Sequence, residues 1–293
     1  MNIKVRIFIL LPELVKKWVT LAYIVYRQVV ESVYASMYNY FETEVGKGLQ
    51  IVNLTGFPRT GTSVLKYYFG AYPGLDINPF NPTGFHVALR KTRRITTNIL
   101  VDKSNHHIKS PDTIFKACGE RTALCCIVRD PRDSLLSLLS FPEAREVPRG
   151  QKFWLYWYHQ YSKFLNFSEH SQYGQRIYFL RYEDFIFQPV MAKTDYLTWL
   201  GLDTSIEKIE NTYSVPETRE FVLDKVHKSK TITADSLQRW KQNALPEKTV
   251  KLLRGWCDYP CVEDLMVQLG YVEDGLAEPT IRPQNFRMFI PDD

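Results

Sequence analysis

The sequence has little net charge and few cysteines, and both shortages narrow the range of functions. Lysine and arginine number 37 against 32 acidic residues, so the formal charge is +5 over 293 residues. This charge is too small and too dispersed for a nucleic-acid-binding surface, so we expect no nucleic-acid partner. The five cysteines show no paired CxxC spacing, which predicts reduced, mostly buried thiols and no metal site. A pocket for a small polyanion fits this composition better.

Long apolar runs are also missing. Charged residues interrupt the apolar stretches of residues 1–45, and none approaches the ~18 uncharged residues of a membrane span. The sequence therefore predicts no membrane span and no signal peptide. The predicted location is cytoplasmic. Leu11, Leu14, Trp18 and Val25 recur at helical spacing, giving an apolar stripe. We expect this stripe to pack on the domain, and peripheral contact with a membrane surface is the alternative.

Three short runs rich in β-branched and aromatic residues have the pattern of buried parallel strands. They span residues 50–57, 122–128 and 176–182. A helix signal follows each run, the last one after a Glu183-Asp184 turn, and further helices are expected at 151–167, 236–242 and 247–256. This alternation predicts an α/β fold with a central parallel sheet, similar to that of P-loop proteins, and helices on both faces. We expect an N-terminal helical extension (1–48), the α/β domain (49–275) and a C-terminal tail (276–293).

A glycine-containing loop, GFPRTGTS at residues 56–63, follows the first predicted strand. Gly56 and Gly61, with a helix starting at Thr62, are typical of a nest of backbone N–H groups around an anion. The nucleotide-triphosphate loop GxxxxGK[ST] has a lysine where this chain has Thr62. Arg59 supplies positive charge instead, through a planar group that donates to phosphate oxygens. The loop alone leaves open an ordinary strand-to-helix turn with a surface arginine.

The strand at 122–128 leads into a second basic segment, RDPRDSLLS at residues 129–137. Pro131 suits the first helical turn and Asp130 suits the cap before it. Arg129 is expected to project from the strand end, and Ser134 and Ser137 share one helix face. In open parallel sheets, ligands bind outside the carboxyl ends of the strands. Two neighbouring anion sites there imply a nucleoside with phosphate at both ends.

These segments resemble the sulfotransferases that use 3′-phosphoadenosine 5′-phosphosulfate (PAPS), over roughly residues 49–256. GFPRTGTS is similar to the family's 5′-phosphosulfate loop, with Arg59 where cytosolic members have lysine and tyrosylprotein sulfotransferases have arginine. RDPRDSLLS is similar to the family's 3′-phosphate site. The resemblance implies that PAPS is bound by Arg59, Thr60, Gly61, Thr62, Ser63, Arg129 and Ser137.

Three weaker similarities extend the site. RYEDF resembles the family's YED segment and implies that Tyr182 lies near the adenine. The stretch HKSKTITADSLQRWKQNALPEK resembles a late segment in which a basic residue closes over the 3′-phosphate, and here either Lys228 or Lys230 fits. HIKSP resembles a Lys-Ser/Thr segment beside the transferred group, which makes Lys109 the second catalytic cation after Arg59.

The resemblance implies sulfuryl transfer from PAPS to an acceptor hydroxyl or amine by in-line displacement, with 3′,5′-diphosphoadenosine (PAP) as the product and no metal. The acceptor must lose a proton, and the family's positions for the base do not transfer: Pro111 stands where cytosolic members have histidine, and Pro79 where tyrosylprotein members have glutamate. We therefore rank His107 first and His86 second as the base. The acceptor is a small molecule, carbohydrate, lipid or peptide.

Two other functions stay open from the sequence. A P-loop kinase or other NTPase shares the strand-loop-helix arrangement, although it needs Mg²⁺ and the lysine that Thr62 replaces. A non-catalytic nucleotide-binding or membrane-peripheral scaffold would keep the fold without the reaction. A comparison of PAP binding with binding of ATP and Mg²⁺ separates the sulfotransferase from the kinase or NTPase. An assay of sulfuryl transfer separates the sulfotransferase from the non-catalytic scaffold.

Overall fold

The computed structural model describes most of the α/β domain and isolated positions of the N-terminal region. The described residues are 18, 22, 25, 28, 29, 32, 35, 36, 50–69, 72, 74–77, 98–105, 108–140, 147–202, 204, 237–241, 245–272 and 275–276.

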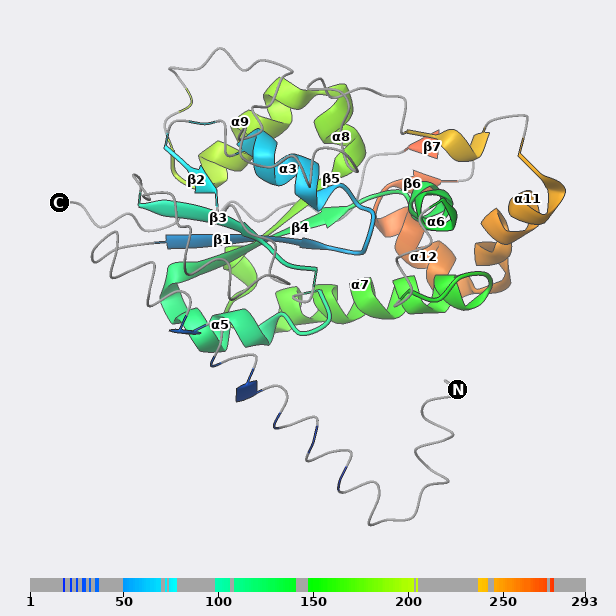
Figure 1. Cartoon of the computed structure of the whole chain (residues 1–293). Coiled ribbons are helices and arrows are strands. Elements are labelled where there is room, and N and C mark those ends of the chain that lie inside the picture. The colour runs from blue at the N-terminus through cyan, green and yellow to red at the C-terminus, as the bar shows by residue number, and fades with distance from the viewer. Residues whose placement is uncertain are drawn as a thin grey trace.

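A five-stranded sheet forms the centre of the fold, with the strand order β2-β3-β1-β4-β5 (Figure 1). Every neighbouring pair is parallel. The strands are β1 (Gln50–Gly56), β2 (Asp76–Ile77), β3 (Ile99–Lys103), β4 (Thr122–Val128) and β5 (Ile177–Arg181). The chain passes from β1 to one side of the sheet and then returns to place β4 on the other side. The order therefore reverses at β1, and ligands of open parallel sheets bind beside such a point.

Helices cover both faces of the sheet. Figure 1 shows α3, α8 and α9 on one face, and α5 and α7 on the other. Their bounds are α3 (Thr62–Phe69), α5 (Asp112–Cys118), α7 (Lys152–His170), α8 (Tyr182–Phe187) and α9 (Pro189–Trp199). Beyond the sheet end lie α6 (Pro131–Leu139), α11 (Glu247–Leu253) and α12 (Pro260–Gln268).

Short elements complete the described chain. The 3-10 helices are η2 (Gly119–Arg121), η3 (Gly174–Arg176), η5 (Arg239–Lys241) and η6 (Gly255–Asp258). An antiparallel hairpin pairs β6 (Tyr271–Val272) with β7 (Gly275–Leu276).

Two hydrophobic cores form because each central strand is apolar on both sides. Leu124, Cys126 and Val128 of β4 pack into the core that includes α5 and α7. Ala123, Cys125 and Ile127 alternate with them and pack into the core that includes α3 and α9. A strand buried on both faces reads as a continuous apolar run, which is the pattern that predicted it. The expected α/β fold with helices on both faces is confirmed.

The predicted elements match the observed ones unevenly. The strand at 122–128 is confirmed at both ends, and the other two predicted strands are slightly shorter than expected. The predicted Glu183-Asp184 turn is wrong, because both residues lie in α8. The described part of the helix predicted at 236–242 contains the 3-10 helix η5. Strands β2 and β3 and helices α5 and α12 were not predicted.

The described N-terminal residues are helical, but their apolar side chains face solvent. The exposed fractions of Trp18, Val25 and Val29 are 62%, 49% and 55%. The expected packing of the apolar stripe on the domain is therefore wrong for Trp18 and Val25, and Leu11 and Leu14 lie outside the described residues. Within the described part of the chain, no helix has the length and apolarity to cross a membrane.

The expectation of reduced, mostly buried thiols is confirmed. All five cysteines are thiols, and Cys118, Cys125 and Cys126 are buried while Cys257 is exposed. Burial raises the pKa of Cys118 to about 12 and the pKa values of Cys125 and Cys126 well above the usual thiol range. The buried thiols are therefore poor nucleophiles.

Candidate active site

The loop after β1 turns sharply into α3. A side chain at Gly56 would put its Cβ 2.6 Å from the carbonyl oxygen of Ile127, so a glycine is required where the loop leaves the sheet. The Thr60 hydroxyl donates to the carbonyl of Phe57 at 2.8 Å, and the Thr60 N–H donates to the same oxygen at 3.2 Å. Arg59 has φ 75° and an exposed side chain. The closed turn thus presents an arginine in a backbone conformation that non-glycine residues rarely adopt.

One hydroxyl fixes the start of the loop to the neighbouring strand. The Phe57 N–H donates to the Tyr161 hydroxyl at 3.3 Å, and this hydroxyl donates to the carbonyl of Ile127 at 2.9 Å. Tyr161 is buried in α7, where its ring lies 6.4 Å from the Phe57 ring, centroid to centroid. The loop is therefore held from the sheet face opposite to α3.

The segment after β4 forms the expected cap. The Asp130 carboxylate accepts a hydrogen bond from the Arg132 N–H at 2.8 Å, and Pro131 occupies the first turn of α6. Both features of the predicted helix start are confirmed. Ser134 is fully buried, whereas Ser137 is half-buried.

The two predicted anion sites meet at the carboxyl ends of β1 and β4. The Arg59 Nε donates to the Ser137 Oγ at 2.9 Å, and the Arg129 Nη1 donates to the Arg59 carbonyl at 3.0 Å. The Arg129 guanidinium carbon lies 4.8 Å from the centroid of the Tyr182 ring, within the range of a cation-π contact. A Cβ at Gly61 would lie 2.6 Å from Cδ2 of the same ring. Tyr182 therefore joins the loop and the strand-end arginine.

A further cation, which the sequence analysis missed, ends the neighbouring strand. Lys103 is the last residue of β3 and pairs in register with Leu54 of β1. Burial lowers the pKa of Lys103, Asp102 raises it, and Arg59 lowers it again. Lys103 thus ends its strand beside β1, close enough to Arg59 to feel its charge. The signal in the sequence was the apolar run at residues 99–101, followed by a charged pair at a strand end.

The remaining predicted residues are less tightly connected. The Thr62 hydroxyl donates to the Asn105 side-chain carbonyl at 3.3 Å. Lys109 is half-buried, with its Nζ 5.9 Å from the centroid of the Tyr156 ring, and its carbonyl accepts from Lys163 Nζ at 2.8 Å. Ser63 is half-buried in the first turn of α3. The other predicted residues, which lie outside the described residues, are His86, His107, Lys228 and Lys230.

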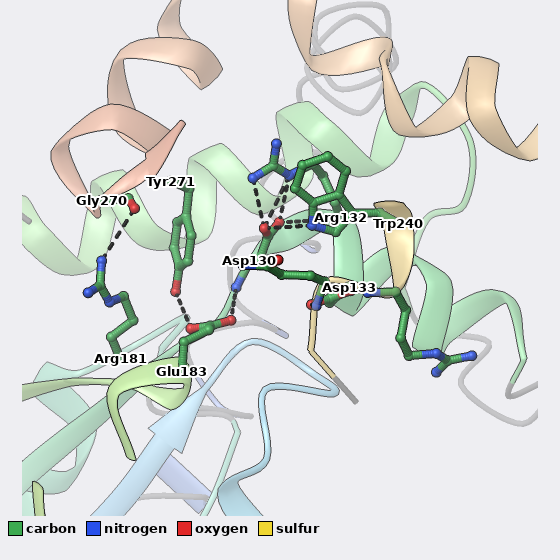
Figure 2. A network of polar contacts seen from close by, with 10 residues as sticks. Asp130, Arg132, Asp133, Arg181, Glu183, Trp240, Gly270 and Tyr271 are labelled. Carbon is green, nitrogen blue, oxygen red and sulfur yellow. Dashed lines mark hydrogen bonds and ion pairs between the residues drawn. The ribbon is translucent and has the colours of Figure 1, made fainter. Parts of the chain in front are cut away.

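A polar network surrounds the start of α6 (Figure 2). Asp130 forms an ion pair with Arg132 at 2.8 Å, and the Trp240 Nε1 donates to the same carboxylate at 3.1 Å. The Arg132 guanidinium carbon stacks 3.6 Å from the centroid of the Trp240 ring. Asp133 accepts from the backbone N–H groups of Gln238 and Arg239 at 2.8 and 2.9 Å. The network thus docks residues 237–241 onto α6.

Glu183 connects this network to the C-terminal hairpin. Its Oε1 accepts from the Asp130 N–H at 2.9 Å, and its Oε2 accepts from the Tyr271 hydroxyl at 2.9 Å (Figure 2). Burial and, second, the Asp130 charge raise the pKa of Glu183 to about 7, while the Asp130 N–H and Arg129 oppose the rise. Burial, followed by the Asp130 charge, likewise raises the pKa of Asp133 to about 6. Two buried carboxyls thus titrate within two pH units of neutrality.

Comparison with known protein families relates the chain to the sulfotransferases. The model of the sulfotransferase family matches residues 82–205. The resemblance to the sulfotransferases is confirmed. The matched segment contains Arg129, Ser137, Tyr182 and Glu183, whereas the loop at 56–63 precedes it. No curated protein matches the sequence at a significant level.

Several solved sulfotransferase structures are similar to this chain. The sulfotransferase domain from the curacin biosynthetic pathway is 16% identical, with a TM-score of 0.51, and the match covers 72% of this chain and 98% of that domain. The sulfotransferase domain of the Synechococcus PCC 7002 olefin synthase is 16% identical with a TM-score of 0.49, over 72% of this chain and 96% of that one. A mouse sulfotransferase complexed with PAP is 15% identical with a TM-score of 0.41, and the match covers 58% of this chain and 64% of that one. The first of these likenesses shows the sulfotransferase fold.

Proposed function

We propose that this chain transfers a sulfuryl group from PAPS to an acceptor hydroxyl or amine by in-line displacement. The observation that carries the proposal is the meeting of two arginines from different strand ends. Arg59 and Arg129 are joined through the Arg59 carbonyl, and Ser137 accepts from Arg59 at 2.9 Å. A nucleotide with phosphates at both its 5′ and 3′ positions needs two such cationic groups next to one aromatic surface.

Each group has a role that its position supports. In the proposal, the loop N–H groups and Arg59 hold the 5′-phosphosulfate, with Thr60, Gly61, Thr62 and Ser63 forming the rest of the cradle. Arg129 and Ser137 hold the 3′-phosphate, and Tyr182 lies against the adenosine. The backbone of the cradle is rigid, because Thr60 closes the turn on Phe57 and Tyr161 fixes the loop start.

Cations beside the leaving oxygen would lower the barrier, because negative charge grows on that oxygen as the bond to sulfur breaks. Arg59 is the first of these cations, and a preorganised donor of this kind typically contributes about 10²–10³ in rate. Lys109 remains the second of these cations, and Lys103 is a further candidate, since it ends β3 beside β1. His107 and His86 remain the proposed bases, ranked in that order.

The nucleotide-binding half of the proposal is tested without any acceptor. Isothermal titration calorimetry is run with PAP in the absence of metal and with ATP plus Mg²⁺. We expect PAP to bind the wild type, and Arg59→Ala and Arg129→Ala each to weaken binding about 10- to 100-fold, because each removes a charge-assisted hydrogen bond. Arg254→Ala is the matched control, since Arg254 is an exposed arginine at the end of α11.

The outcomes separate the competing functions. Binding of ATP with Mg²⁺ and no binding of PAP would refute the proposal and favour a kinase or NTPase. Transfer of radiolabelled sulfate from PAPS is then measured against a panel of phenols, sugars, lipids and tyrosine peptides. PAP binding without transfer to any of them would favour the scaffold, and transfer abolished by Arg59→Ala would support the enzyme.

A further inference from the structure

Glu183 lies directly behind the arginine of the proposed nucleotide site. It follows Tyr182, whose ring contacts the Arg129 guanidinium, and its carboxylate accepts the N–H of Asp130, the residue after Arg129. The side chain of Arg129 is therefore held by Tyr182, and the backbone that follows it is held by Glu183. With an exposed fraction of 1%, Glu183 itself cannot touch a ligand.

We propose that Glu183 is a positioning residue of the nucleotide site that fixes the Arg129-Asp130 turn and takes up a proton when an anion binds Arg129. The inference rests on the proposed function only for the identity of the anion. The coupling follows from charge: Arg129 favours the ionised carboxylate, and a phosphate bound to Arg129 offsets that influence.

The surroundings of Glu183 make this coupling specific. The groups that face it are Asp130 and Arg129 at the end of β4, Tyr271 in β6, Arg181 in β5 and Tyr161 in α7. Asp130 is already paired with Arg132, and the Tyr271 hydroxyl donates to Glu183. Of these groups, Arg129 is the one that would bind the nucleotide in the proposed site.

The coupling has a measurable size. The pKa of Glu183 is raised to about 7, mainly by burial. If bound phosphate raises it by a further unit, about half a proton is taken up per nucleotide at pH 7.5. The affinity for PAP then falls about sixfold as the pH rises from 6.5 to 8.5. Asp133, whose pKa is raised to about 6, is mostly ionised at pH 7.5 and contributes less there.

The experiment is calorimetric titration of the full chain with PAP at pH 7.5 in two buffers of different ionisation enthalpy. The difference between the buffers gives the number of protons taken up. Glu183→Gln keeps an acceptor for the Asp130 N–H but cannot titrate, so we expect its proton uptake to fall towards zero and its affinity to change little with pH. Asp184→Asn is the control, because it removes the neighbouring carboxylate, which pairs with Arg181.

A second measurement needs no variant. The carboxyl ¹³C signal of Glu183, assigned through sequential connectivities, is titrated in the free and the PAP-bound protein, and we expect the midpoint to rise on binding. PAP binding with an unchanged midpoint, or with equal proton uptake in wild type and Glu183→Gln, would overturn the inference while leaving the proposed function intact. Failure of PAP to bind the wild type would instead refute the proposed function.

Discussion

Gly61 and Tyr182 provide a direct test of how the loop and the YED segment fit together. At Gly61 the backbone has φ +92°, and an added Cβ would lie 2.6 Å from Cδ2 of the Tyr182 ring. Gly61→Ala therefore introduces two separate penalties. A left-handed backbone costs roughly 1–2 kcal/mol for a residue with a Cβ, and the forced repacking of the ring costs about 1–3 kcal/mol more.

A second glycine separates the two penalties. Gly119 also has a positive φ, +59°, with ψ −135°, a backbone conformation that is essentially restricted to glycine, but an added Cβ there would meet nothing within 4 Å. Gly119→Ala should thus lower the free energy of unfolding by a backbone penalty alone, about 1–3 kcal/mol. Gly61→Ala should lower it by about 2–5 kcal/mol. Both values are measured by urea denaturation of the purified variants.

A double-mutant cycle identifies the ring as the cause. In the Tyr182→Ala background, Gly61→Ala should cost only the backbone penalty, which gives a coupling free energy of about 1–3 kcal/mol. A cycle with no coupling would show that the Tyr182 ring does not pack on the loop. That result would also remove the aromatic surface from the proposed nucleotide site.

Three other predictions follow from buried or exposed groups. The folded protein binds the Glu183 proton more tightly than the unfolded chain, so this contribution to stability is complete below pH ~4.5 and is lost as the pH rises through about 7. Urea denaturation from pH 4.5 to 8 should show this loss in the wild type and a flatter profile in Glu183→Gln; parallel profiles would contradict it. Trp240→Phe keeps the ring beside α6 but removes the hydrogen bond to Asp130, so the free energy of unfolding should fall by about 1–2 kcal/mol, and an unchanged value would argue against that bond. Iodoacetamide should label the exposed Cys257 rapidly and the buried Cys118 only on unfolding, which mass spectrometry of peptides can check, with equal labelling as the opposing result.

Local patterns predicted the parts of the site that are encoded over a few residues. The segment at 129–137 carries a strand end, a capping aspartate, a proline at the first helical position and two serines at helical spacing, and the structure has each of these features. The loop at 56–63 could also be predicted from local sequence, because its glycines and Arg59 follow a buried strand. The sheet and its two covered faces followed from the same apolar runs.

What the sequence could not show depends on contacts between distant segments. Strand β3 has only three apolar residues before Asp102 and Lys103, too short a run to distinguish it from a loop, so neither the strand nor Lys103 at its end was predicted. The Glu183-Asp184 pair was interpreted as a turn, because nothing local shows that a buried carboxylate accepts from Asp130, 53 residues earlier, and from Tyr271, 88 residues later. Helix α12 differs from these, because Pro260 in its first turn and apolar residues at helical spacing are local signals from which it is predictable.

The Tyr161 hydroxyl has a consequence for how motions of the site are correlated. It accepts from the N–H of Phe57 and donates to the carbonyl of Ile127, so a single oxygen atom spans the ends of β1 and β4. A displacement of α7 along its axis would pull on both strand ends together. Arg59 and Arg129 should therefore keep a nearly constant separation while the surrounding helices fluctuate, and under the proposed function that separation would match the distance between the two phosphate groups of the nucleotide.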